Sequence, residues 1–191
     1  MRAISLLLSF AILGSAAIVP RDATDGVYVV TMDAAGNEIH SRVSDPITAR
    51  EEGLSLDTET DAREARSLLR REKSVDCNCY HDLDPKDTNA AVKDLKYQVG
   101  SFKFFSYKSV YSIRGSVIAF ACNMHSESYT SAQLIPQMLE AVTQACGRYV
   151  VGAATTDETP GKHEAWVGYM ENIDGVDFCY QRTTWTDSSC P

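Results

Sequence analysis

Cysteine and tryptophan are missing from the first part of this chain, because no residue of either type precedes Arg71. Asn-x-Ser/Thr sequences are missing throughout, so the chain has no acceptor for N-linked glycosylation. No apolar run approaches the roughly 20 residues with which a helix crosses a bilayer, and the C-terminal end is not an apolar tail of the kind that directs a lipid anchor. We therefore expect no membrane anchor.

The chain also has fewer basic than acidic residues. The chain has 18 Lys and Arg against 26 Asp and Glu, which gives a net charge of -8. The part after Arg71 is acidic as well, with 10 basic and 15 acidic residues. Proteins that bind nucleic acids use basic patches to contact the phosphates. The composition therefore predicts no nucleic-acid partner.

The first residues have the three parts of a secretory signal peptide. Met1-Arg2 provides a positive start, Ile4 to Ile12 are apolar, and residues 14–17 are the small residues Gly-Ser-Ala-Ala. We expect residues 1–17 to be removed by cleavage after Ala17. The protein is therefore predicted to be secreted and extracellular.

Residues 18–71 are predicted to be a pro-segment. We expect this segment to assist folding or to keep the protein inactive until export. Glu, Asp and Arg dominate residues 49–71, and such a chain buries too little apolar surface to offset the entropy lost on folding. Much of the segment is therefore expected to be disordered. Val27–Met32 is the exception, because its pattern predicts a short strand followed by a turn over Asp33–Glu38.

The pair Arg70-Arg71 resembles the dibasic site that processing proteases of the kexin type cut. It stands where the composition changes, just before the first cysteine. We expect cleavage there, which would leave residues 72–191 as the mature cysteine-rich domain. The alternative interpretation is that the pair ends a charged helix over residues 61–70.

Six cysteines in a short secreted domain predict three disulfides. Fifteen pairings are possible, and the sequence does not choose among them. Cys77 and Cys79 are too close in the chain to pair with each other, so each is expected to bond to a different element. The predicted disulfide residues are Cys77, Cys79, Cys122, Cys146, Cys179 and Cys190.

The periodicity after Arg71 predicts an α+β fold in the order β-α-β-β-α-β plus a C-terminal hairpin. Asp84-Pro85 begins the first helix, with Lys93, Asp94 and Lys96 on its solvent side, and Gly100 ends it. Such an order fits a split βαβ, ferredoxin-like two-layer sandwich, with two helices on one face of an antiparallel sheet. The predicted strands are 75–80, 102–111, 116–122, 148–154, 164–170 and 176–181, and the second helix ends at Cys146.

An aromatic stretch predicts a partner-binding surface. Its residues cannot all face one core on a strand of period two, so some are expected to be exposed for protein binding. The alternative is that they pack under loops or the C-terminal tail. The residues concerned are Phe102, Phe104, Phe105, Tyr107 and Tyr111. An unpaired sheet edge would offer a second route, by addition of a partner strand.

Catalytic and metal-binding interpretations are weaker. His125, His163 and Glu164, with Arg148 or Lys162, have the residue types of a ribonuclease, but neighbours on a strand point to opposite faces. His81 with Asp82 and Asp84 is more simply a turn and helix cap, and Cys77-x-Cys79 as a metal pair conflicts with disulfide formation. Asp174-Gly175-x-Asp177 is first a turn signal. We assign no catalytic residue, metal or cofactor.

Two sequence blocks resemble cysteine-rich small secreted proteins of filamentous fungi. They are Gly115–Asn123 (GSVIAFACN) and Cys146–Gly152 (CGRYVVG). The layout is also similar to that of smut-virus killer toxins, which are disulfide-bonded α/β proteins with more cysteines at a different spacing. The resemblance implies a protein that acts outside the producing cell, on a host or a competitor, by binding.

The sequence therefore predicts a non-enzymatic, effector- or toxin-like protein that binds an extracellular or host protein target. A small secreted hydrolase that uses His125, His163 and Glu164 is the alternative from another class. A structural protein of the cell wall or surface is the third. An exposed aromatic patch favours binding, whereas the two histidines in one pocket would favour an enzyme.

The dibasic site gives a direct prediction. Replacing Arg70 and Arg71 together by alanine removes the basic side chains that a kexin-type protease needs. The secreted product should then be larger than the wild-type product by the mass of the retained pro-segment, as measured by intact mass spectrometry. An unchanged mass would show that the protein is not processed at this site.

Overall fold

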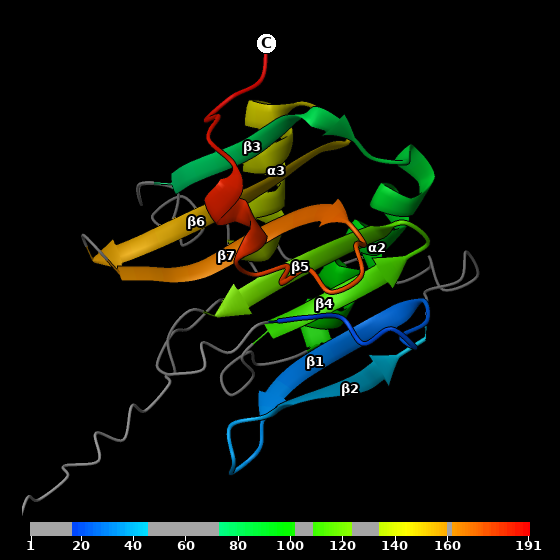
Figure 1. Ribbon diagram of the computed structural model, residues 1–191. Helices are drawn as coiled ribbons and strands as arrows, with labels where there is room; N and C mark the ends of the chain where they lie inside the picture. Colours follow the sequence, from blue (N-terminus) through cyan, green and yellow to red (C-terminus); the bar gives the residue numbers. More distant parts are fainter. Residues whose placement is uncertain (1–16, 46–72, 102–108, 124–133, 160–161) are drawn as a thin grey trace, which may run out of the picture.

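The computed structural model describes residues 17–45, 73–101, 109–123, 134–159 and 162–191 (Figure 1). They form one seven-stranded sheet in the order β2-β1-β4-β5-β7-β6-β3, in which every neighbouring pair is antiparallel. The strands are β1 (Gly26–Met32), β2 (Glu38–Ser44), β3 (Lys73–Asp82), β4 (Ser109–Arg114), β5 (Val117–Asn123), β6 (Val150–Thr159) and β7 (Lys162–Glu171). The described helices are α2 (Pro85–Ser101), α3 (Leu134–Cys146) and the short 3-10 helix η2 (Gln181–Thr184).

The two α-helices cover one face of the sheet, and the chain after β7 crosses the opposite face (Figure 1). The predicted α+β class and the antiparallel sheet are therefore confirmed. In the described ranges, no helix is long and apolar enough to span a membrane.

The ferredoxin-like strand order is not confirmed. In that layout β3, the first strand after Arg71, would lie between β5 and β6. Here β7 occupies that place and pairs with both, while β3 lies outside β6 at the edge. The sequence pattern identifies strands but not their neighbours. β6 continues to Thr159 and β7 begins at Lys162, so both strands extend beyond the predicted ranges 148–154 and 164–170. Thr155 and Thr156 favour this extension because β-branched residues fit strands.

The predicted strand over 176–181 is wrong. The side chain of Asp177 accepts hydrogen bonds from the backbone N–H groups of Cys179 and Tyr180, at 3.0 and 3.2 Å. These bonds fold the chain into a turn that leads into η2.

The start of α2 follows its sequence signal, whereas the helix passes the predicted end at Gly100 by one residue, to Ser101. The N–H of Asp87 donates to Oδ1 of Asp84 at 2.8 Å, and Pro85 is the first helical residue of α2. In α3, Pro136 stands in the first turn, where its missing N–H has no helical acceptor. One face of α3 is buried, and it comprises Leu134, Ile135, Met138, Leu139, Val142 and Cys146.

Two strands of the sheet come from the predicted pro-segment. The predicted strand at Val27–Met32 is confirmed as β1, which pairs with β2 and with β4. Val27, Tyr28, Val29 and Val30 are all buried, so β1 is covered on both of its faces. One hydrogen-bonded sheet therefore contains residues from both sides of Arg70-Arg71, although residues 46–72 themselves lie outside the described part.

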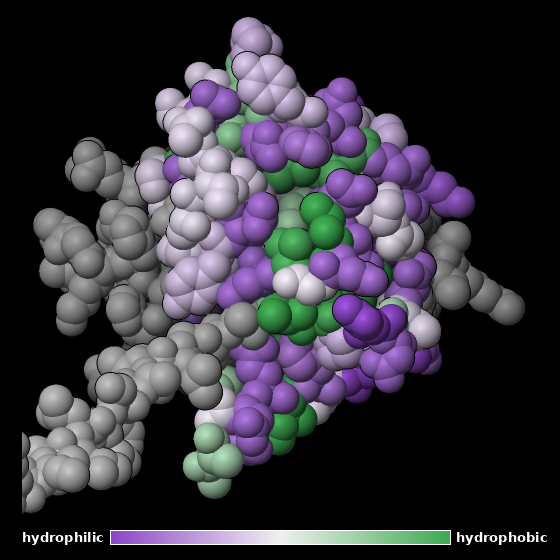
Figure 2. All heavy atoms as spheres, in the orientation of Figure 1, coloured by the Kyte–Doolittle hydropathy of each residue, from purple (hydrophilic) through white to green (hydrophobic). Residues whose placement is uncertain are grey.

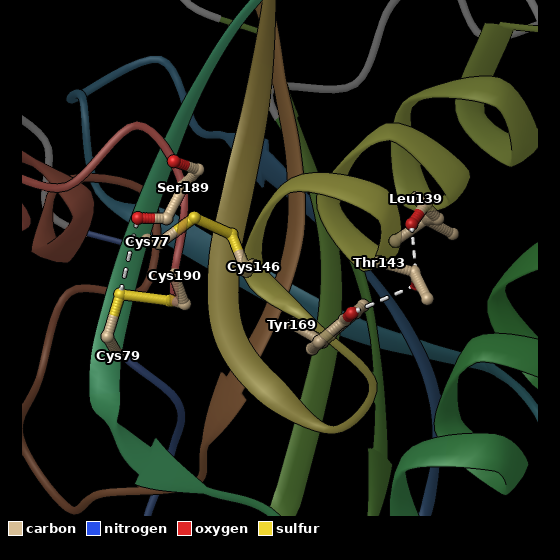
Figure 3. Close-up of a disulfide and its surroundings, with 8 residues drawn as sticks. All are labelled: Cys77, Cys79, Leu139, Thr143, Cys146, Tyr169, Ser189 and Cys190. Atoms are coloured by element: carbon tan, nitrogen blue, oxygen red, sulfur yellow. Dashed lines mark hydrogen bonds between the residues drawn. A yellow bond between two sulfur atoms is a disulfide. The ribbon is translucent and has the colours of Figure 1, made fainter.

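Three disulfides account for all six cysteines, as predicted. Cys77–Cys146 joins β3 to α3, Cys79–Cys190 joins β3 to the C-terminal end, and Cys122–Cys179 joins β5 to the turn on the opposite face. Figure 3 shows the two bridges at β3. Both layers that cover the sheet are thus bonded covalently to it.

Asp94 corrects another prediction. We expected it on the solvent side of α2, but it is 1 % exposed and pairs with Arg114 of β4. Arg114 contacts both carboxylate oxygens, with Nε–Oδ2 at 2.5 Å and the second nitrogen to Oδ1 at 3.1 Å. The ion pair fixes α2 to the sheet, because a buried carboxylate needs its partner.

Replacing Arg114 by methionine should lower the free energy of unfolding by about 3–5 kcal/mol, because the Asp94 carboxylate loses its cation inside the protein. The matched control is Arg114→Met with Asp94→Leu, which removes both charges and should recover a large part of that loss. Urea unfolding of the oxidised protein measures both. Equal stability of the two variants would contradict a buried pair.

Candidate functional site

The aromatic residues predicted to bind a partner fall into two groups. Phe102, Phe104, Phe105 and Tyr107 lie outside the described residues. Tyr111 is fully buried on β4, so its ring is not an exposed contact in the intact chain. Burial also raises the pKa of Tyr111, which keeps its hydroxyl protonated.

Tyr111 is the centre of an aromatic cluster that consists of Tyr28, His40, Tyr111, Phe120 and Phe178. Its ring stacks on Tyr28 with centroids 5.1 Å apart and contacts Phe178 at 5.0 Å. Nδ1 of His40 lies 3.0 Å from the Tyr111 hydroxyl. Two members, Tyr28 and His40, come from the predicted pro-segment, and the cluster therefore joins the two parts of the chain.

The face that the C-terminal segment crosses has an apolar centre. Figure 2 shows hydrophobic atoms gathered in the middle of this face and surrounded by hydrophilic ones. Ile173 and Tyr180 of this segment are more than one third exposed, as is Ile18, which pairs with Asp177 across the face.

The histidines of the hydrolase interpretation do not form a described site. His125 lies outside the described residues. The backbone of His163 pairs with Asp157 in the hairpin of β6 and β7, but its side chain and that of Glu164 lie outside the described part. The histidine and glutamate side chains of this interpretation therefore lie outside the described part of the structure.

The metal interpretations have ordinary structural explanations. Asp84 caps α2, His81 is exposed, and Cys77 and Cys79 are bridged. Gly175 turns the chain with φ of 74°. Among the described residues, no group of three His, Cys, Asp or Glu side chains could hold a metal ion.

A groove of about 510 Å³ lies between α2, α3 and the sheet. It is within the range of ligand sites, which are concave and contain a few convergent polar groups. α2 contributes Lys96, α3 contributes Glu140, and Arg148 follows α3, so the groove has two cations and one anion. The full lining is Thr88, Asn89, Val92, Lys96, Pro136, Leu139, Glu140, Thr143, Arg148, Tyr149 and Tyr169.

Hydroxyl groups line the floor of the groove. The Thr143 hydroxyl donates to the carbonyl of Leu139 at 3.1 Å and lies 3.1 Å from the Tyr169 hydroxyl (Figure 3). Because the Thr143 proton is already used, Tyr169 donates to Thr143 and keeps acceptor capacity. Burial raises the pKa of Tyr169, so the hydroxyl remains a neutral donor.

Tyr149 enters the groove from a strained position. Its φ is 64°, a left-handed conformation that is unfavourable for a residue with a side chain. Its carbonyl accepts from the N–H of Leu83 at 2.7 Å, and its hydroxyl accepts from Asn89 at 3.2 Å. The hydroxyl proton of Tyr149 is thus available to a ligand. Strain of this kind collects at functional sites.

Nothing in the sequence predicts this groove. Arg148 has a predicted role only in the hydrolase interpretation, and Tyr149, Thr143 and Tyr169 have none. Their positions in the chain span two helices, a turn and a strand, so no local motif joins them. The nearest signal is the helix stop at Gly147, whose φ of 99° starts the turn that presents Tyr149.

Comparison with known proteins gives no guide to this groove, since no protein family, curated protein or solved structure matches the chain.

The strain at Tyr149 can be measured with two variants that both remove the ring. Tyr149→Gly should be more stable than Tyr149→Ala by about 1 kcal/mol, because glycine adopts positive φ without a Cβ clash. Thermal and urea unfolding of the two proteins give the difference. If the alanine variant were equally stable or more stable, Tyr149 would not be strained.

Proposed function

We propose that this chain is a secreted, disulfide-bonded protein that binds a host or competitor target outside the producing cell, in the manner of fungal effectors and killer toxins. The bridging of every cysteine supports the extracellular part of this proposal, because disulfides persist in oxidising compartments. The bridges close loops with separations of 57 to 111 residues, and loops of this length constrain the unfolded chain strongly.

The groove between α2 and α3 is the observation on which the binding function rests. It offers the Tyr149 proton, the cations Lys96 and Arg148, and the acceptor oxygens of Tyr169 and Glu140. Its described lining combines two cations, one carboxylate and several hydroxyl groups. This combination supports recognition of a polar or anionic group.

The protein is proposed to be made as a precursor that a kexin-type protease cuts after Arg71. The change in composition at this point supports the proposal, as does the position of all six cysteines on its C-terminal side. Since no disulfide crosses the site, the two products would have no covalent link.

The binding function predicts the effect of removing the two cations of the groove. Lys96→Ala with Arg148→Ala should weaken binding about tenfold or more, because hydrogen bonds to charged groups contribute about 1.5–3 kcal/mol. The measurement is binding of fluorescently labelled protein to intact cells of candidate hosts and competing fungi.

The matched control for this charge change is Lys86→Ala with Lys93→Ala, which removes two cations from α2 outside the groove lining. It should bind as the wild type does. Equal losses in the two double variants would indicate a general charge effect, and unchanged binding of the groove variant would contradict the proposed site.

A further inference from the structure

We propose that the N-terminal segment is not discarded after processing but remains bound as a second, non-covalent subunit, with the edge of β4 and the aromatic cluster as its binding site. This inference rests on the proposed cleavage at Arg70-Arg71. It replaces a removable pro-segment by a two-chain protein whose smaller chain supplies two strands of the sheet.

Main-chain pairing is the first observation. β1 pairs with β4 over five consecutive residues, from Gly26 opposite Ile113 to Val30 opposite Ser109. Loss of β1 would leave the N–H and C=O groups of this side of β4 without partners, and an unpaired edge of a buried strand is unfavourable. The same pairing persists without any covalent link, as in other cases where one chain adds a strand to another.

Burial of β1 is the second observation. Val27, Tyr28, Val29 and Val30 are each less than 10 % exposed, and Val30 is completely buried. A strand that only lies on the surface of a separately folded domain buries one of its faces. β1 is instead buried on both faces, as a strand inside a sheet is. Burial of apolar surface is the main force in association of protein chains.

The aromatic cluster is the third observation. Tyr28 stacks on Tyr111 with an interplanar angle of 8°, and His40 contacts the Tyr111 hydroxyl. Departure of the segment would remove both of these contacts and uncover Tyr111, which is fully buried here. Exposed surfaces of this kind promote association, so the segment is the natural occupant of this site.

Polar contacts at the end of β4 fix the register of the segment. The backbone N–H of Gly115 donates to the carboxylate of Asp25 at 3.0 Å, and Arg42 of the same segment orients Asp25 by donating to its carbonyl at 2.5 Å. Ile18 pairs with Asp177 on the face that the C-terminal segment crosses. The segment therefore contacts the rest of the protein at two places. One is the edge of β4, and the other is the sheet face that the C-terminal segment crosses.

The experiment uses the purified full-length precursor, cut in vitro with a kexin-type protease. The cut protein is passed through a gel-filtration column in neutral buffer at about 1 μM, because weak complexes dissociate at this concentration. Both fragments should elute in one peak at the size of the uncut chain. A denaturing, non-reducing gel should separate them. Elution of the smaller fragment by itself, with the larger fragment still folded, would overturn the proposal.

A lack of cutting at Arg70-Arg71 would count against the processing proposal alone. The two-subunit inference is then tested on the same chain with a recognition sequence for a specific protease in place of the dibasic pair. The expected co-elution and the overturning result are the same as for natural cleavage.

Two serine variants on one strand test which contacts hold the segment. Val30→Ser places a hydroxyl in the buried side of β1 and should release the fragment after cutting, whereas Met32→Ser, at a position 41 % exposed, should not. Release from both or from neither would contradict a site built on the buried side chains.

A measurement on the wild-type sequence covers the case in which Val30→Ser does not fold. For two non-covalent chains, the urea midpoint rises with protein concentration, because unfolding separates the chains. The cut protein should show this dependence and the uncut precursor should not. A midpoint independent of concentration in the cut protein would overturn the proposal.

Discussion

The pairing of β1 with β4 is the interaction on which the rest of this structure depends. It joins a segment without cysteine to a domain that contains all six, and it places Tyr28 and His40 against Tyr111. Without it, the buried centre of the sheet would end at β4. The folded unit therefore extends across the change in composition at Arg70-Arg71.

Two further constraints position the helices around the groove. The Asp94–Arg114 pair fixes α2 to β4, and the Cys77–Cys146 bridge fixes the last residue of α3 to β3. The space between the helices is thus set from both sides by contacts with the sheet. This fixed spacing explains how Tyr149 can be held in a strained conformation, because its carbonyl and its hydroxyl are both bonded to neighbouring elements.

Local features of the sequence predicted much of the local structure, although the strand over 176–181 was wrong. The cap at Asp84, the strand at Val27–Met32 and the three disulfides were predictable, because each depends on neighbours in the chain or on the even number of cysteines. The order of the strands was not, since it depends on which edges meet in space. Asp94 was missed for the same reason, because its burial depends on its distant partner Arg114. The positive φ of Tyr149 depends on the turn around it, which the composition of the turn does not reveal.

Hydrogen exchange of the uncut chain measures whether β1 opens separately from the rest of the sheet. Backbone amides of β1 between Val27 and Val30 should exchange as slowly as those of β5, because both strands lie inside one sheet and open only with the whole fold. Fast exchange of the β1 amides in a protein whose β5 amides are protected would contradict the account. It would show that the N-terminal segment is attached to the fold without being part of it.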